Sequence, residues 1–207
     1  MTEKFRKLSK PKQQRILKAA LREFSEHSFD QASTNRIVKD AGIGKGMLFY
    51  YFKSKKDLYY YIADYGMDYI KEELLDKVDN NITDFIEKNK QMSMIKMKAY
   101  QKNPEVFNFF ATLMMNNDPM FSGVLEEKLM NMRRYGYQSM FENIDKSLFR
   151  EDIKADEAIR LIRLSMDGYE KEMIATLQGK KLSEVDMDPY WEDFFRFLDL
   201  LKKVLYK

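Results

Sequence analysis

The 207-residue chain holds 36 Lys and Arg, 33 Asp and Glu, one histidine and no cysteine, and its net charge is +3. Without thiols it forms neither disulfides nor thiolate metal sites, which is typical of a reducing compartment. No apolar run approaches the roughly 18 residues that span a bilayer. The basic start MTEKFRKLSKPK has no apolar stretch behind it that would make it a secretory signal. We therefore expect a cytoplasmic protein with no membrane partner.

The charge is divided unevenly along the chain. Residues 1–60 contain 14 basic and 6 acidic residues, a net charge of +8, whereas the remainder contains 22 and 27, a net charge of −5. A basic surface can serve solubility alone. A basic end on a mildly acidic body nevertheless favours an anionic partner for that end.

Helical patterns run through nearly the whole chain. Only four prolines and eight glycines interrupt it, and no segment shows the two-residue alternation of a strand. The predicted fold is all-α, with a three-helix head at residues 1–54 and a larger helical body at 55–207. About nine helices are expected, at 10–26, 34–41, 44–51, 55–78, 82–102, 104–117, 120–147, 154–178 and 188–206.

The first two of these helices have clear faces and ends. In the first, the apolar residues recur at helical spacing. The second begins at Ser33 and Thr34, whose hydroxyls can cap free backbone N–H groups. It ends at Gly42, a residue type that readily adopts the left-handed conformation after a helix.

The segment AGIGKGMLFYYF, residues 41–52, then turns directly into a third short helix. Two short helices joined by a glycine-containing turn form the pattern of a helix-turn-helix. Leu48 and Phe52 share an inward face with Tyr51 at its edge, whereas the rows of Lys45 with Phe49 and of Gly46 with Tyr50 face outward.

Duplex DNA is a good candidate to cover this outward surface. Tyr50 and the backbone N–H groups can bind phosphates, and Gly46 lets the helix approach the backbone closely. Met47 and Phe49 offer apolar surface to a thymine methyl group. Thr34 and Asn35 are placed for a phosphate and a base edge. For any single aromatic residue here, packing on the fourth helix is the alternative.

Residues 12–62 resemble the DNA-binding head of the TetR (tetracycline-repressor-like) family of bacterial transcription regulators. The resemblance covers about a quarter of the chain. It is carried by Ile16-Leu17-x-Ala19-Ala20-x-x-x-Phe24, by Thr34-x-x-x-Ile/Val-x-x-x-Ala41-Gly42-Ile43, and by Lys45-Gly46-x-Leu48-Phe49-Tyr50-Tyr51-Phe52-Lys53-Ser54-Lys55-x-x-Leu58.

The resemblance implies that Thr34, Tyr50 and Lys55 hold phosphates. It also implies that four residues lie at or near base edges, namely Asn35, Lys45, Phe49 and Tyr51. The family often has other residues where this chain has Gly44, Met47, Phe49 and Tyr51. Because Met47 and Phe49 lack the hydroxyl that the family often has there, we expect more apolar contacts with the bases and fewer hydrogen bonds. An unusual operator sequence is therefore expected.

A head this small reads few base pairs, so two heads on a two-fold axis are expected to read a palindromic operator. The last two helices carry apolar stripes that either bury inside one protomer or form a dimer surface. The family resemblance favours a four-helix homodimer interface. Its expected residues are Ile159, Ile162, Met166, Met173, Trp191, Phe194, Phe195, Leu198 and Leu201.

The middle of the chain is rich in methionine and aromatic residues. They can form an ordinary helical core, but methionine also suits adaptable binding surfaces, and the family body generally encloses an effector pocket. A ligand there is expected to be small and mostly apolar or aromatic. The expected lining is Tyr65, Met97, Phe107, Phe110, Met114, Tyr137, Met140, Phe141 and Tyr169.

The resemblance implies a repressor that the effector releases through a shift between two dimer states. The helix that begins at Lys55 is the natural connector from head to body. We also consider a ligand-binding or adaptor protein whose head no longer binds DNA specifically.

An enzyme is disfavoured. The only histidine, His27, lies at a helix end among polar residues, and GIGKG lacks P-loop spacing and a preceding strand. We predict no catalytic residue, cofactor or metal.

Overall fold

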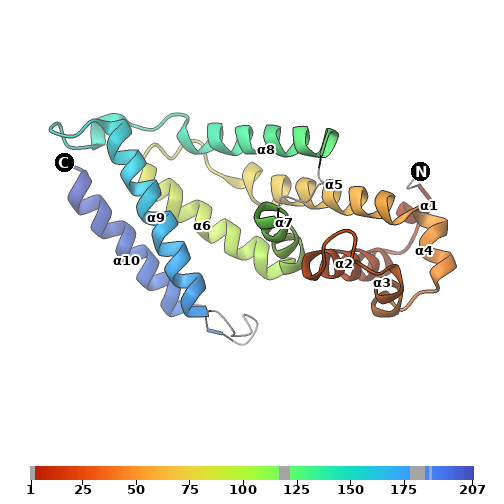
Figure 1. The fold of residues 1–207 in the computed structure, drawn as a ribbon. Helices are drawn as coiled ribbons and strands as arrows, with labels where there is room; N and C mark the ends of the chain where they lie inside the picture. Colours follow the sequence, from red (N-terminus) through yellow and green to blue (C-terminus); the bar gives the residue numbers. More distant parts are fainter. Residues whose placement is uncertain (1–2, 117–121, 178–184, 187) are drawn as a thin grey trace. The chain divides into compact units, whose positions relative to one another are not determined.

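The computed structural model describes residues 3–116, 122–177, 185–186 and 188–207 of the chain (Figure 1). The prediction of an all-α fold is confirmed. The chain forms two compact units. Unit 1 comprises residues 1–77 and 95–137, and unit 2 comprises 78–94 and 138–207. No helix within the described ranges is both long enough and apolar enough to cross a membrane.

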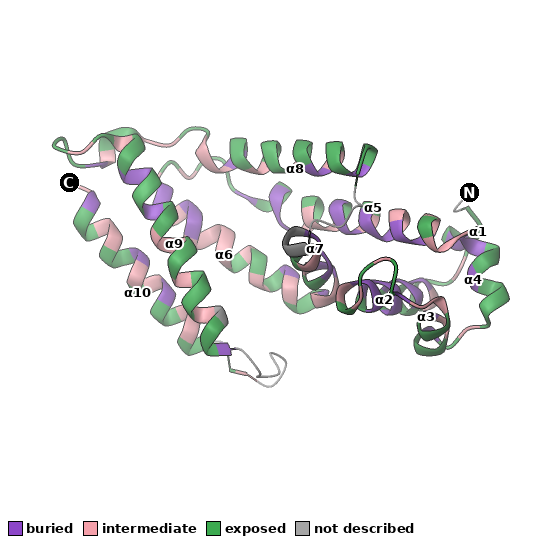
Figure 2. Ribbon diagram, in the orientation of Figure 1, coloured by how far each residue is buried: buried purple, intermediate pink, exposed green. Residues whose placement is uncertain are grey.

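Unit 1 begins with the elements of the head, α1 (Glu3–Arg6), α2 (Lys10–Glu26), α3 (Thr34–Ala41) and α4 (Lys45–Tyr51). The central helix is α2, whose buried residues recur along one side from Gln13 to Phe24 (Figure 2). Both α2 and α3 begin and end at the residues that the sequence predicts. At the end of α3, Gly42 has φ of 64° and ψ of 41°, the left-handed conformation expected there.

The short helix α1 was not predicted. Four residues are too few to show helical periodicity, and a helix of that length is not stable in isolation. It exists because Phe5 is fully buried among aromatic residues of the head. Tertiary packing therefore creates this element.

The rest of unit 1 consists of α5 (Lys55–Glu73), the 3-10 turn η1 (Leu75–Lys77), the end of α6 (Phe85–Lys102), α7 (Pro104–Asn116) and most of α8 (Val124–Phe141). The prediction of one helix over 55–78 was wrong at its end. Leu74 leaves the helical conformation with φ of −123° and ψ of −67°, and the chain continues as η1.

The helix predicted at 120–147 also ends early. Asn143 has a left-handed φ of 62°, and Asp145 then caps the 3-10 turn η2 (Lys146–Leu148). Asparagine tolerates this conformation better than most residues, which explains the stop. The first two predicted residues of that helix lie outside the described ranges, as do the last residues predicted for 104–117 and 154–178.

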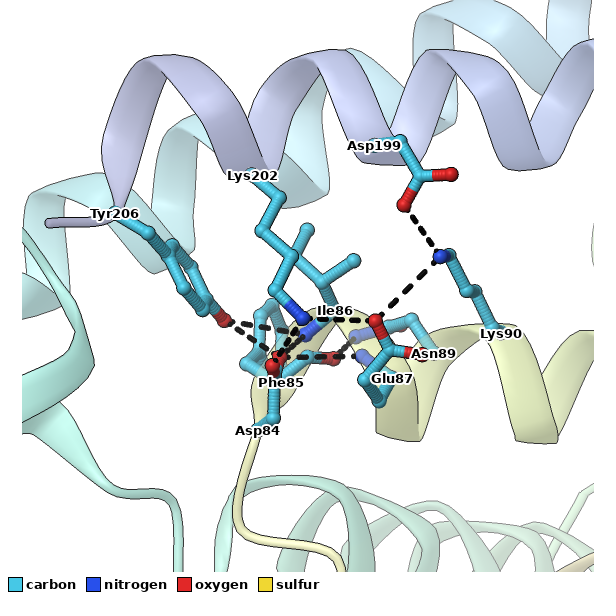
Figure 3. A network of polar contacts seen from close by, with 9 residues as sticks. All are labelled: Asp84, Phe85, Ile86, Glu87, Asn89, Lys90, Asp199, Lys202 and Tyr206. Carbon is cyan, nitrogen blue, oxygen red and sulfur yellow. Dashed lines mark hydrogen bonds and ion pairs between the residues drawn. The ribbon is translucent and has the colours of Figure 1, made fainter.

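Unit 2 is built from the start of α6, the end of α8, α9 (Ala155–Leu177) and α10 (Asp188–Leu205). One network of polar contacts in this unit is centred on Asp84, which precedes α6 (Figure 3). Asp84 Oδ1 accepts hydrogen bonds from the backbone N–H of Ile86 at 2.9 Å and from the Tyr206 hydroxyl at 2.9 Å. Lys202 Nζ lies 2.6 Å from Asp84 Oδ2. One carboxylate thus caps α6 and ties it to the end of the chain.

Candidate nucleic-acid interface

The helix α4 has a buried and an exposed side. Leu48 and Phe52, which follows α4, are fully buried, whereas 37% of Phe49 and 58% of Tyr50 remain accessible. Met47 is exposed on the same side, and Lys45 is exposed at the start of the helix. These are the outward residues that the sequence predicts, so α4 presents apolar and phenolic surface to solvent.

The turn before α4 is fixed by backbone hydrogen bonds. The N–H of Ile43 donates to Val38 O at 3.0 Å, and Gly42 supplies the left-handed turn. A Cβ added at Gly46 would meet nothing within 4 Å. No neighbour within the described structure therefore requires glycine at position 46, which leaves close approach to an external surface as a reason for it.

A buried carboxylate positions α3 against α2. Glu23 accepts hydrogen bonds from the N–H of Ser33 at 2.7 Å and from Arg36 Nε at 2.9 Å. Burial raises the pKa of the Glu23 carboxyl, but the hydrogen bonds from Arg36 and Ser33 outweigh it and leave that pKa below 4.5. The first turn of α3 is thereby fixed with Asn35 exposed and Thr34 half-buried.

Two expected DNA contacts are occupied inside the head. Tyr51 is only 4% exposed and packs edge-on against Phe5, with ring centroids 6.1 Å apart. Lys55 Nζ donates to the carbonyl oxygens of Phe29, Asp30 and Ala32 at 2.7, 3.2 and 3.1 Å. Tyr51 therefore belongs to the core, and Lys55 holds the loop between α2 and α3. Sequence spacing could not show this, because the partners lie over 20 residues away.

Comparison with known proteins identifies this head. Residues 16–62 match the sequence model of the family described as "Bacterial regulatory proteins, tetR family". An HTH-type transcriptional regulator of Staphylococcus aureus (strain USA300) is 43% identical over 63 residues, which are 30% of this chain and 34% of that protein. Residues 16–62 of the chain therefore match a TetR-type head. The chain spans about a third of the length of the curated relatives that it matches.

The whole fold is also shared with TetR-type structures. A TetR family transcriptional regulator from Chloroflexus aurantiacus J-10-FL superposes with a TM-score of 0.71 at 21% identity, over 100% of this chain and 98% of that one. The ketosteroid transcriptional regulator KstR2 of Mycobacterium tuberculosis gives 0.64 at 16% identity, over 97% of both chains. At these identities the likeness concerns the fold alone.

The nine expected pocket residues are divided between the two units. Tyr65, Met97, Phe107, Phe110 and Tyr137 belong to unit 1, together with Met114, whose side chain lies outside the described part. Met140, Phe141 and Tyr169 belong to unit 2. There Phe141 packs on Phe85 at 5.4 Å and Tyr169 stacks on Phe197 at 4.9 Å, which are core contacts.

Within unit 1, Phe107 of that set packs against two aromatic residues outside it. The ring of Phe107 lies 6.4 Å from that of Tyr69 and 5.8 Å from that of Tyr100, and all three are half-buried. Nearby on α5, the Tyr65 hydroxyl accepts a hydrogen bond from Asn103 Nδ2 at 3.3 Å. Tyr100 belongs to the methionine- and aromatic-rich middle of the chain but not to the expected lining. Tyr69 is also outside that lining, although it lies four residues after Tyr65 on the same helical face.

The expected dimer residues of α9 and α10 mostly face into unit 2. Ile162 and Leu198 are fully buried in the core of unit 2, with Phe85 and Ile86. Ile159 and Phe194 are also buried there, and the others are half-buried: Met166, Met173, Trp191, Phe195 and Leu201. These helices leave a different apolar set exposed, namely Leu161, Leu164, Leu200 and Val204.

Proposed function

We propose that this protein is a TetR-family transcriptional regulator that binds duplex DNA through α3 and α4. The observation that carries the proposal is the two-sided α4, which buries Leu48 and Phe52 but leaves Phe49 and Tyr50 exposed. The net charge of +8 in residues 1–60 supports it, because phosphate neutralisation supplies much of DNA affinity. Residues 1–54 would act as the DNA-binding part and 55–207 as the regulatory part.

Selection from random duplex DNA, followed by sequencing, tests this proposal. We expect enrichment of one palindrome by the purified wild-type protein. A Lys45→Ala/Tyr50→Ala double variant should lose that enrichment, whereas a Lys171→Ala variant on the exposed side of α9 should keep it. Absence of enrichment at low salt, from a folded protein, would contradict the DNA-binding proposal and favour the adaptor alternative.

The proposed regulator acts as a homodimer whose contact surface is the exposed apolar set of α9 and α10. Leu161 and Leu164 are three residues apart on α9, and Leu200 and Val204 are four apart on α10, so each pair shares one helical face. All four are about half exposed. A Leu164→Glu/Leu200→Glu variant should become monomeric by analytical ultracentrifugation and keep its circular dichroism, because neither side chain is in the core of unit 2. A matched Arg163→Glu variant, at an exposed position of α9 outside this apolar face, should remain dimeric.

The proposed effector is a small, mostly apolar or aromatic molecule that releases a repressor from its operator. Two observations on unit 1 support a site beside Tyr69, Tyr100 and Phe107. The aromatic rings are half-buried, and Asn103 Oδ1 is buried without a hydrogen-bond partner among the described residues. A ligand with one donor group would satisfy that oxygen, since an unpaired buried acceptor is costly.

A thermal-shift screen of aromatic compounds tests the effector proposal. A ligand at 100 times its dissociation constant stabilises the folded state by about 2.7 kcal/mol. The shift should shrink in an Asn103→Leu variant, and the same compound should release operator DNA from the wild-type protein. A compound whose shift is unchanged by Asn103→Leu would place the site elsewhere.

A further inference from the structure

The first helix of the chain is fixed to the head although it has only four residues. Phe5 is 0% exposed. Its ring centroid lies 5.0 Å from that of Phe52 and 5.3 Å from that of Tyr61, which it meets edge-on. Burial of this phenylalanine side chain removes a large apolar surface from water, which holds the single helical turn in place.

A second contact closes the other end of α1. The side-chain amide of Gln13, itself buried on α2, donates from Nε2 to Arg6 O at 3.0 Å and to Leu8 O at 2.7 Å. Terminal carbonyl groups of a helix have no partner within the helix. Gln13 supplies that partner, so α1 is attached to α2 at its end and to α4 and α5 through Phe5.

These two attachments place a cation beside the exposed side of α4. Lys4 Nζ lies 3.9 Å from the ring centroid of Tyr50, and Figure 1 shows α1 next to α4. Lys4 is exposed, and Tyr50 is the most exposed aromatic residue described on α4. An exposed cation–π contact is weak, so the ammonium group can exchange it for a phosphate oxygen, which binds it more strongly.

We propose that α1 is a third element of the DNA-binding surface and that Lys4 contacts a backbone phosphate beside the one bound by Tyr50. The inference rests on the proposed DNA-binding function. A phosphate contact of this kind fixes the position of the protein on the duplex without reading sequence. The ring of Tyr50 holds the Lys4 ammonium group on the exposed side of α4. Phe5 and Gln13 act as positioning residues that keep α1 next to α4.

The dependence of DNA affinity on salt tests the inference. Each neutralised phosphate contributes about 0.9 to the slope of log affinity against log salt. With two copies of Lys4 in a dimer, Lys4→Gln should lower the magnitude of the slope by about 1.8 on the selected operator duplex. The Lys154→Gln variant, at an exposed position just before α9, has the same net charge and should retain the wild-type slope. Fluorescence anisotropy of a labelled duplex at five or more salt concentrations gives both slopes.

A second variant separates the position of Lys4 from its charge. Phe5→Ala keeps Lys4 but removes the side chain that holds α1 on the head, so its slope should fall as in Lys4→Gln. Lys4 is exposed, and its substitution does not disturb the core. Wild-type binding with an unchanged slope in Lys4→Gln would overturn this inference alone. Failure of the wild-type protein to bind any duplex would overturn the DNA-binding function and this inference together.

Discussion

Replacement of Glu23 by glutamine tests how the head maintains the angle between α2 and α3. The wild-type carboxylate accepts hydrogen bonds from Ser33 N–H and from two nitrogens of Arg36. Glutamine retains an oxygen acceptor for Ser33 but loses the charge that Arg36 binds. Hydrogen bonds to charged groups contribute about 1.5–3 kcal/mol when buried. Because about half of the Arg36 side chain is exposed, we expect a smaller loss of about 1–2 kcal/mol in the free energy of unfolding.

Hydrogen–deuterium exchange measured by mass spectrometry gives this loss locally. Peptides from α2 and α3 should exchange about 5–30 times faster in Glu23→Gln at pH 7, since about 1.4 kcal/mol corresponds to a factor of 10. Peptides from α9 and α10 serve as internal controls and should not change. Glu23→Ala should cost more, about 2–4 kcal/mol, because Ser33 N–H then also loses its partner.

The difference in unfolding free energy between wild type and Glu23→Gln should depend on pH if it is electrostatic in origin. The folded-state pKa of Glu23 is lowered, so its stabilisation is complete above the unfolded-state pKa of about 4.3 and is lost as pH falls through the folded value. Urea unfolding of wild type and Glu23→Gln should therefore converge below pH 4. An equal difference at pH 7 and at pH 3, or a difference below about 0.3 kcal/mol at pH 7, would refute the reasoning.

Three further substitutions have definite expected outcomes. Gly66→Ala places a Cβ 2.6 Å from Phe110 Cε2, and overpacking should cost about 1–3 kcal/mol in thermal unfolding, whereas Gly168→Ala in open space on α9 should not destabilise. Gly46→Ala should raise stability by up to about 1 kcal/mol yet weaken operator binding in anisotropy assays, if close approach to DNA requires glycine. Burial raises the pKa of the Asp84 carboxyl, but the hydrogen bonds from Lys202 and Tyr206 outweigh burial and leave that pKa lowered. Asp84→Asn should therefore destabilise unit 2 at pH 7, and its difference from wild type should shrink as pH falls below the unfolded-state pKa of about 3.9. The fluorescence of the single tryptophan, which lies in that unit, follows the unfolding.

The head could be predicted largely from sequence because its signals are local. The helical faces of α2 and α3, the serine cap at Ser33 and the left-handed Gly42 each act within a few residues. The outward positions of Phe49 and Tyr50 follow from their angle relative to Leu48. The body was less predictable, since its apolar stripes show which faces are buried but not against which partner.

Sequence by itself determined the all-helical class, the positions of α2, α3 and α4 and the exposed side of α4, because helix propensity and periodicity are local properties. Only the tertiary structure decided the roles of residues whose partners are distant in sequence. Tyr51 packs against Phe5 and is therefore part of the core. The ammonium group of Lys55 donates hydrogen bonds to three loop carbonyl groups. The same kind of contact created α1, where Phe5 and Gln13 hold a helix too short to form without them.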